Sequence, residues 1–151
     1  MQNNSTSFAP PSFPGISAPP QTGSSLGRGR ILIVDDERGI RRFLSYGLGL
    51  EGFDCRDAAG VSEAIKLLET QPFDAVISDL RMRGTSGLEL LKDVREKHPR
   101  VAFLMATAAD DAGVGVQAMK EGADDYLPKP FLIEPVLTAL NRAIEKKRLE
   151  R

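Results

Sequence analysis

The chain contains a single cysteine and no long hydrophobic segment, and both shortages limit its class. Cys55 is the only cysteine among the 151 residues, so an intrachain disulfide is impossible, which fits a reducing compartment. The longest apolar runs fall far short of the roughly 18 residues that a membrane-spanning helix needs. The N-terminus lacks the basic and apolar regions of a secretory signal. We therefore expect a soluble, cytoplasmic protein with no membrane contact.

A strong excess of either charge is also missing. The formal net charge is -1, which gives no electrostatic argument for direct nucleic-acid binding or for an anionic membrane surface. His98 is the only histidine, and it precedes Pro99 at the expected end of a helix, so we assign it a structural or solvated role. The apolar share of 41% and the charged share of 27% are typical of a globular domain.

The first 29 residues differ in composition from the rest of the chain. They hold five of the ten prolines, six serines and four glycines, and Arg28 is their only charged side chain. Such a segment buries too little apolar surface to offset the entropy lost on ordering. We expect a disordered tail at residues 1–29, a folded domain at residues 30–148 and a charged end at residues 149–151. A short docking motif formed by Phe8, Phe13 and Ile16 is the alternative for the tail.

From residue 30 onward, short apolar runs alternate with amphipathic segments. The apolar runs predict buried strands at residues 31–34, 53–57, 73–78, 101–106 and 123–127. Apolar residues at helical spacing predict helices at residues 37–50, 61 to about 72, 86–97, 111–121 and from about 134 onward. We expect the fourth helix to be the weakest, because Gly113 and Gly115 both lower helix stability.

This alternation of strands and helices predicts an α/β fold with helices on both faces of a parallel sheet. Right-handed crossovers leave few possible strand orders. The strand at residues 53–57 is the most polar, which places it at an edge and makes the first and third strands central neighbours. We therefore predict a flavodoxin-like sheet of five strands in the order 2-1-3-4-5, with a site at the switch point between strands 1 and 3.

Chemically active side chains follow four of the five expected strands. Asp35 and Asp36 follow the first strand, Asp79 the third, Thr107 the fourth, and Lys129 comes just after the fifth. These strand ends meet at one edge of a parallel sheet, where ligands bind. Three neighbouring carboxylates repel one another, and a hard cation such as Mg²⁺ removes that conflict. The sequence therefore predicts a magnesium site at which Thr107 and Lys129 can contact a phosphate.

Plain structural alternatives exist for parts of this site. Asp35 and Asp36 could cap the helix that follows them, and one of the two could serve both purposes. Thr107 could simply be a β-branched residue at the end of a strand. Lys129 precedes Pro130, and we predict a cis peptide bond there, which would aim the lysine back at the acids.

Four segments together resemble the receiver domain of bacterial two-component response regulators. They read ILIVDDE, ISDLRMRGTSGLELL, MATA and GADDYLPKPF, in this order and within about residues 30–148. The flavodoxin-like strand order is also that of the chemotaxis receiver. Any one of these segments would be weak evidence, whereas all four at this spacing are specific.

The resemblance implies a role for each acidic residue. Asp79 would accept a phosphoryl group from a sensor histidine kinase or a phosphotransfer protein. Asp36 and Asp79 would bind Mg²⁺ directly and Asp35 through water, and the backbone carbonyl of Arg81 would complete the protein ligands.

The resemblance also implies a grip on the phosphate and a conformational switch. Thr107 and the backbone amide of Ala108 would hold the phosphate, with Lys129 opposite. Tyr126 would be the switch aromatic, turning inward as Thr107 moves.

Two arginines close to Asp79 depart from the family's pattern. Receivers commonly have a proline at the position that Arg83 occupies after Met82. Arg81 places a long cation beside the site, and we expect it to pair with or shield the phosphoryl group and to alter its lifetime. This is where we expect the chain to differ from its relatives.

The resemblance implies a phospho-accepting signalling module rather than a turnover enzyme, with only self-catalysed phosphotransfer and autodephosphorylation. The last helix uses the residues after Phe131, so we expect output through a protein partner bound at the face of the fourth helix, fifth strand and fifth helix. A phosphorylation-dependent homodimer is one form of such output. A regulator whose output domain had been removed would look the same.

Two other functions fit parts of this pattern. A magnesium-dependent phosphohydrolase of the haloacid dehalogenase type also uses a strand-end aspartate, but it requires Asp-x-Asp after the first strand and a cap domain. A receiver-like scaffold that never takes phosphate is the third hypothesis, and the complete acidic set with Thr107 and Lys129 argues against it.

Overall fold

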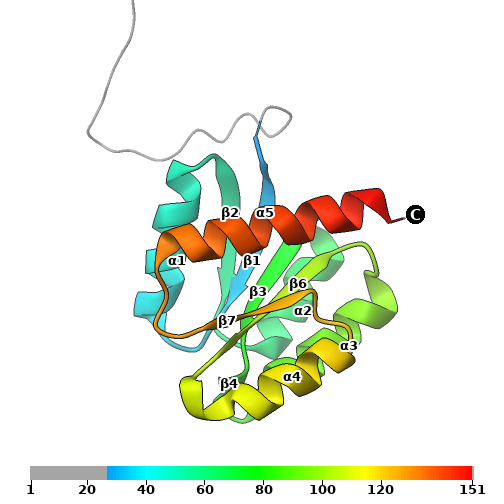
Figure 1. Ribbon diagram of the computed structural model, residues 1–151. Coiled ribbons are helices and arrows are strands. Elements are labelled where there is room, and N and C mark those ends of the chain that lie inside the picture. Colours follow the sequence, from blue (N-terminus) through cyan, green and yellow to red (C-terminus); the bar gives the residue numbers. More distant parts are fainter. Residues whose placement is uncertain (1–26, 151) are drawn as a thin grey trace, which may run out of the picture.

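The computed structural model describes residues 27–150, so nearly all of the tail expected at residues 1–29 lies outside the described residues. The main sheet consists of β1 (Gly29–Val34), β2 (Phe53–Ala58), β3 (Ala75–Asp79), β6 (Ala102–Thr107) and β7 (Asp125–Pro128). The helices are α1 (Arg38–Leu50), α2 (Val61–Thr70), α3 (Gly87–Lys97), α4 (Ala112–Lys120) and α5 (Ile133–Leu149). These elements confirm the predicted alternation, with boundaries that differ by one or two residues (Figure 1).

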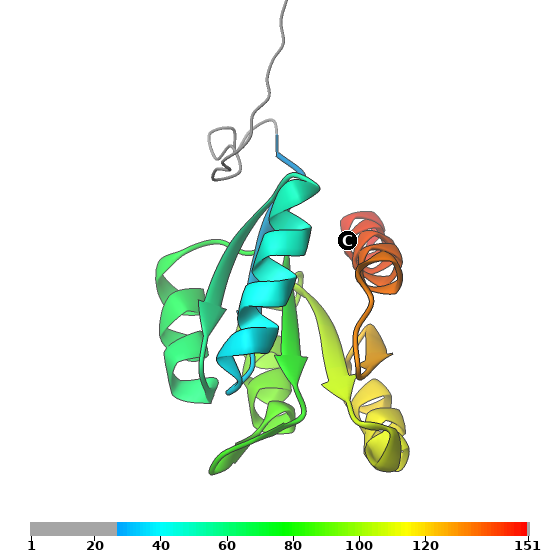
Figure 2. The ribbon, with the colours of Figure 1, turned by 90° about the vertical axis from the view of Figure 1, so that its left-hand side faces the viewer.

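The strand order of the main sheet is β2-β1-β3-β6-β7, and every neighbouring pair is parallel. This is the predicted flavodoxin-like order 2-1-3-4-5, with the polar strand β2 at an edge. The carboxyl ends of the strands therefore meet at one edge of the sheet, to which the arrowheads point in Figure 2.

Two apolar cores lie on the two faces of the sheet. On one face, α1 and α5 pack over strand residues such as Ile33, Ile77 and Leu104. On the other face, α2, α3 and α4 cover the alternate strand residues, among them Val34, Val76 and Phe103. The central strands β3 and β6 are buried along their whole length, which explains their continuous apolar sequence.

A small hairpin, which the sequence analysis did not predict, interrupts the chain after β3. It pairs β4 (Arg81–Met82) with β5 (Thr85–Ser86), and Gly84 closes the turn with φ of 73°. A positive φ of this kind favours glycine. The hairpin extends beyond the carboxyl edge of the sheet (Figure 2), so it lies beside any site at that edge.

The Lys129–Pro130 peptide bond is cis, as predicted. Among the helices of residues 27–150, none combines the length and the apolar character that crossing a membrane requires.

Candidate functional site

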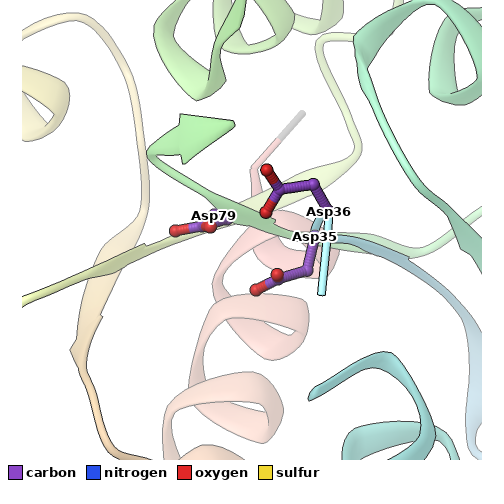
Figure 3. A group of neighbouring side chains, drawn as sticks. All are labelled: Asp35, Asp36 and Asp79. Atoms are coloured by element: carbon purple, nitrogen blue, oxygen red, sulfur yellow. The ribbon is translucent and has the colours of Figure 1, made fainter. Parts of the chain in front are cut away.

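The three predicted aspartates come together at the ends of β1 and β3. Asp35 and Asp79 are buried and Asp36 is partly exposed. Each offers a carboxylate oxygen, and these oxygens all lie within 4.8 Å of one another. Figure 3 shows the three side chains leaving the two neighbouring strand ends side by side.

Lys129 joins the acidic group from the loop after β7. Its Nζ lies 3.2 Å from Oδ2 of Asp35 and 3.1 Å from Oδ1 of Asp79. Its backbone N–H donates to the carbonyl of Thr107 at 2.8 Å, which ties the lysine's loop to the end of β6. One ammonium therefore bridges carboxylates from two strands.

The charges of this group are only partly compensated. Burial raises the pKa of Asp79, the nearby Asp35 raises it further, and Lys129 opposes both effects. Burial alone would lower the pKa of Lys129, but the Asp35 and Asp79 carboxylates raise it overall. Three carboxylates and one lysine leave the group with excess negative charge. Carboxylate oxygens with excess negative charge suit a hard divalent cation such as Mg²⁺.

Backbone amides orient Asp35 and Asp36. Oδ1 of Asp35 accepts a hydrogen bond from the N–H of Glu37 at 2.8 Å, while its other oxygen faces Lys129. Glu37, rather than either aspartate, is the N-cap residue of α1. Oδ2 of Asp36 accepts from the N–H of Arg83 at 3.0 Å, a bond that a proline at this position could not donate. Both carboxylates are therefore fixed by backbone amides that lie outside α1.

Thr107 lies at the same edge of the sheet as the acidic group. It is the buried last residue of β6, and its neighbour Ala106 pairs with Asp79 across the sheet. A Cβ placed on Gly115 of α4 would lie 3.5 Å from the Thr107 methyl carbon and 3.3 Å from the Tyr126 ring. Thr107 and Tyr126 therefore both face α4 at this glycine, and Tyr126 is 37% exposed. Ala108 follows Thr107 and is exposed.

Arg81 is engaged by a residue that the sequence analysis did not single out. Its Nε donates to Oδ2 of Asp111 at 2.8 Å and its Nη2 to Oδ1 at 2.7 Å. Asp111 ends a 3₁₀ turn, η2 (Ala109–Asp111), just before α4. The only sequence signal was an aspartate before a helical pattern, which is typical of an N-cap.

A groove opens next to Lys129, between α1 and the loop before α5. It has a volume of about 430 Å³, and its apolar lining comes from Ile40, Phe43, Pro130 and Phe131. The sequence did not indicate this groove, because its walls come from segments about ninety residues apart. The charged site therefore has an apolar groove next to it, on the side of Lys129.

Comparison with known proteins identifies relatives of this arrangement. The family model described as "Response regulator receiver domain" matches residues 31–141. The DNA-binding transcriptional regulator NtrC of Escherichia coli (strain K12) is 38% identical over 117 residues, which cover 78% of this chain and 25% of that protein. The response regulator protein PilR of Pseudomonas aeruginosa is 41% identical over 119 residues, covering 76% of this chain and 27% of PilR. The chain thus spans about a quarter of the length of these relatives.

Solved structures show the same likeness. A response regulator receiver domain protein from Clostridium thermocellum superposes with a TM-score of 0.75 at 32% identity, covering 80% of this chain and 97% of that one. NtrX from Brucella abortus, solved in complex with ADP, superposes with a TM-score of 0.77 at 29% identity, covering 80% of this chain and 28% of NtrX.

Proposed function

Because the chain belongs to the response regulator receiver domain family of two-component systems, we propose that Asp79 accepts a phosphoryl group and that the phosphorylated domain signals to a protein partner. The observation that carries this proposal is the bridging of Asp35 and Asp79 by Lys129 at the carboxyl edge of the sheet. A buried carboxylate beside a lysine and a divalent-cation site combines a nucleophile with the positive charge that phosphoryl transfer needs.

The donor in this proposal is a phosphohistidine of a sensor histidine kinase or a phosphotransfer protein. A carboxylate oxygen of Asp79 attacks the phosphorus, an O–P bond forms, and the N–P bond breaks with its electron pair going to the histidine nitrogen. Lys129 neutralises charge on the transferring oxygens. The donor must cover the mouth of the site, and the groove lined by Ile40 and Phe43 adjoins that mouth.

Mg²⁺ is the proposed cofactor. Asp36, Asp79 and the carbonyl of Arg81 would hold it directly, and Asp35 would hold it through water. When bound, the ion supplies positive charge beside the phosphoryl oxygens. The hydrogen bond from the Arg83 amide supports this assignment, because it fixes the Asp36 carboxylate close to those of Asp35 and Asp79.

Loss of the signal is proposed to be autodephosphorylation rather than turnover of a separate substrate. Water attacks the phosphorus, the O–P bond to Asp79 breaks, and inorganic phosphate leaves while the carboxylate is restored.

The proposed output starts at Thr107. Its hydroxyl and the amide of Ala108 would grip the phosphoryl oxygens, and Tyr126 would turn inward toward the space left by Thr107. The packing of Thr107 and Tyr126 at Gly115 supports this coupling, because a shift of either side chain changes the surface that α4 rests on. The face of α4, β7 and α5 would then bind a partner, an output domain or a second copy of the chain.

We place this signalling in the cytoplasm and propose no direct nucleic-acid contact for these residues, given their net charge.

Intact-mass spectrometry tests this proposal. The protein is treated with acetyl phosphate and Mg²⁺, and the expected result is a mass increase of one phosphoryl group that Asp79→Asn abolishes. Asp57→Asn, at an exposed acid on β2, is the matched control and should retain the modification. An unmodified wild type would instead indicate a receiver-like scaffold.

A further inference from the structure

The helix α4 begins at a residue type that usually caps helices, but the side chain of that residue is engaged elsewhere. Asp111 is the N-cap residue of α4 and makes no side-chain cap hydrogen bond. By contrast, Ser86 at the N-cap of α3 accepts from the N–H of Leu88 at 3.1 Å. Both oxygens of Asp111 accept from Arg81 instead. The Arg81 ion pair therefore competes with capping of α4.

A missing cap weakens the start of α4, because the sequence there is already a poor helix former. Gly113 and Gly115 lie in the first turns of the helix, and each glycine lowers helix stability relative to alanine. A Cβ on Gly113 would meet nothing within 4 Å, so packing does not compensate for this weakness there. A side-chain cap at Asp111 would therefore change the stability of the first turn.

Arg81 is placed to leave Asp111 for another anion. It follows Asp79 by two residues, and its side chain is 69% exposed, so little packing holds it in place. A phosphoryl group on Asp79 would bring about two negative charges and several acceptor oxygens. Arginine binds such a group in the same bidentate manner as a carboxylate, and more strongly because of the greater charge.

We propose that phosphorylation of Asp79 exchanges the partners of Arg81, so that its guanidinium moves from Asp111 to the phosphoryl oxygens and the freed Asp111 caps the first turn of α4. Asp111 is then a positioning residue that holds Arg81 away from the site until the phosphoryl group arrives. This inference rests on the proposed function, since it requires the phosphoryl group on Asp79. It provides a charge-driven route to α4 beside the one through Thr107 and Tyr126.

The exchange leaves no charge without a partner. In the unphosphorylated state Arg81 and Asp111 neutralise each other, and this hydrogen bonding lowers the pKa of Asp111. In the phosphorylated state the Asp111 carboxylate faces the first amides of α4, where the helix dipole favours negative charge. Asp111 has φ of -107° and ψ of 19°, which is not the extended conformation of a capping residue, so the turn η2 that ends at Asp111 must adjust.

Amide hydrogen exchange in the first turn of α4 tests the inference. In the unphosphorylated protein, Arg81→Met frees Asp111 and should slow exchange of the residue 113 and 114 amides about fivefold, as a side-chain cap would. Asp111→Ala, added to Arg81→Met, should remove this protection. Arg148→Met, which breaks an exposed ion pair with Glu145 on α5, is the control and should leave α4 unchanged.

The same amides are then followed after phosphorylation with acetyl phosphate and Mg²⁺. The wild type should gain protection at the start of α4, and Asp111→Ala should lose that gain. In Arg81→Met the amides are already protected, so phosphorylation should add little.

The lifetime of the phosphoryl group gives a second measurement. Asp111→Ala frees Arg81 to shield the phosphoryl group and should slow dephosphorylation, whereas Arg81→Met should speed it. In the Arg81→Met background, Asp111→Ala should have a much smaller effect, because the direct route through Arg81 is gone and only the route through α4 remains.

Two results would overturn the inference: unchanged α4 exchange in unphosphorylated Arg81→Met, or independent effects of the two substitutions on dephosphorylation. Failure of the proposed function gives a different pattern. In that case Asp79 takes no phosphoryl group, while the comparison of unphosphorylated variants still reports on the cap.

Discussion

Replacement of Asp79 by asparagine should stabilise the fold, although Asp79 lies in an ion pair. The substitution keeps the size of the side chain, removes its charge and replaces one acceptor oxygen with an NH₂ donor, while the amide oxygen can still accept from Lys129. Asp79 is buried between two other carboxylates and one lysine, so its charge takes part in one attraction and two repulsions.

The magnitude follows from the distances. At an effective dielectric constant of about 20, the pair with Lys129 at 3.1 Å contributes about 5 kcal/mol of attraction. At the 4.8 Å limit of the oxygen separations, a repulsion from Asp35 or from Asp36 amounts to about 3.5 kcal/mol. The balance is a net repulsion of about 1–2 kcal/mol. Without divalent cations, Asp79→Asn should therefore raise the melting temperature by about 4–8 °C.

The effect should depend on Mg²⁺ and on pH in defined directions. Mg²⁺ bound at the proposed site would offset the repulsion between the acids of the wild type, so millimolar Mg²⁺ should stabilise the wild type more than the variant. The pKa of Asp79 is raised in the folded state, so the folded protein binds a proton at Asp79 more readily than the unfolded protein does. As the pH falls toward the usual pKa range of an aspartate, the wild type should therefore become more stable relative to the variant. The advantage of Asp79→Asn should therefore shrink at acidic pH.

Thermal and urea unfolding, followed by circular dichroism in EDTA and in Mg²⁺, measure these effects. Asp57→Asn is the control, because Asp57 is about half exposed and pairs with Arg41, so its loss should change stability little. A variant that is less stable than the wild type in EDTA would refute the argument, since the Lys129 attraction would then outweigh the repulsion between the acids.

Two more predictions concern packing and reactivity. Gly87→Ala should destabilise the protein by about 1–3 kcal/mol in urea unfolding, because a Cβ there would lie 2.8 Å from Sδ of Met105 and would press on the carbonyl of Asp79. Gly113→Ala, in open space on α4, should instead stabilise by up to about 1 kcal/mol, and equal midpoints for the two variants would contradict the packing argument. Burial raises the pKa of Cys55 to about 12, so iodoacetamide at pH 8 should label the native protein far more slowly than the urea-unfolded protein. Equal labelling rates would mean that the thiol is not protected by the fold.

The sheet and the acidic site were predictable because strong local signals specify them. Continuous apolar runs marked the buried strands, and the polarity of residues 53–57 placed that strand at the edge. Since parallel strands end at one edge, the residues that follow them had to meet there, and Asp35, Asp79 and Lys129 do so. The position of these site residues can be inferred without knowing any tertiary contact, because it depends only on the strands running in the same direction.

The remaining features depend on contacts that no local pattern encodes. The hairpin of β4 and β5 has strands of only two residues each, which is too short for a period-2 pattern to show. The Arg81–Asp111 pair joins residues thirty positions apart and is set by the conformation of two loops. The groove beside Lys129 likewise needs α1 and the loop before α5 to be placed together.

Chemical location of the phosphoryl group shows whether Asp79 is the acceptor. After treatment with acetyl phosphate and Mg²⁺, borohydride reduces an acyl phosphate of aspartate to homoserine, and peptide mass spectrometry identifies the residue. We expect homoserine at position 79 and at no other aspartate. Homoserine at Asp35 or Asp36, or no homoserine despite phosphorylation, would contradict it.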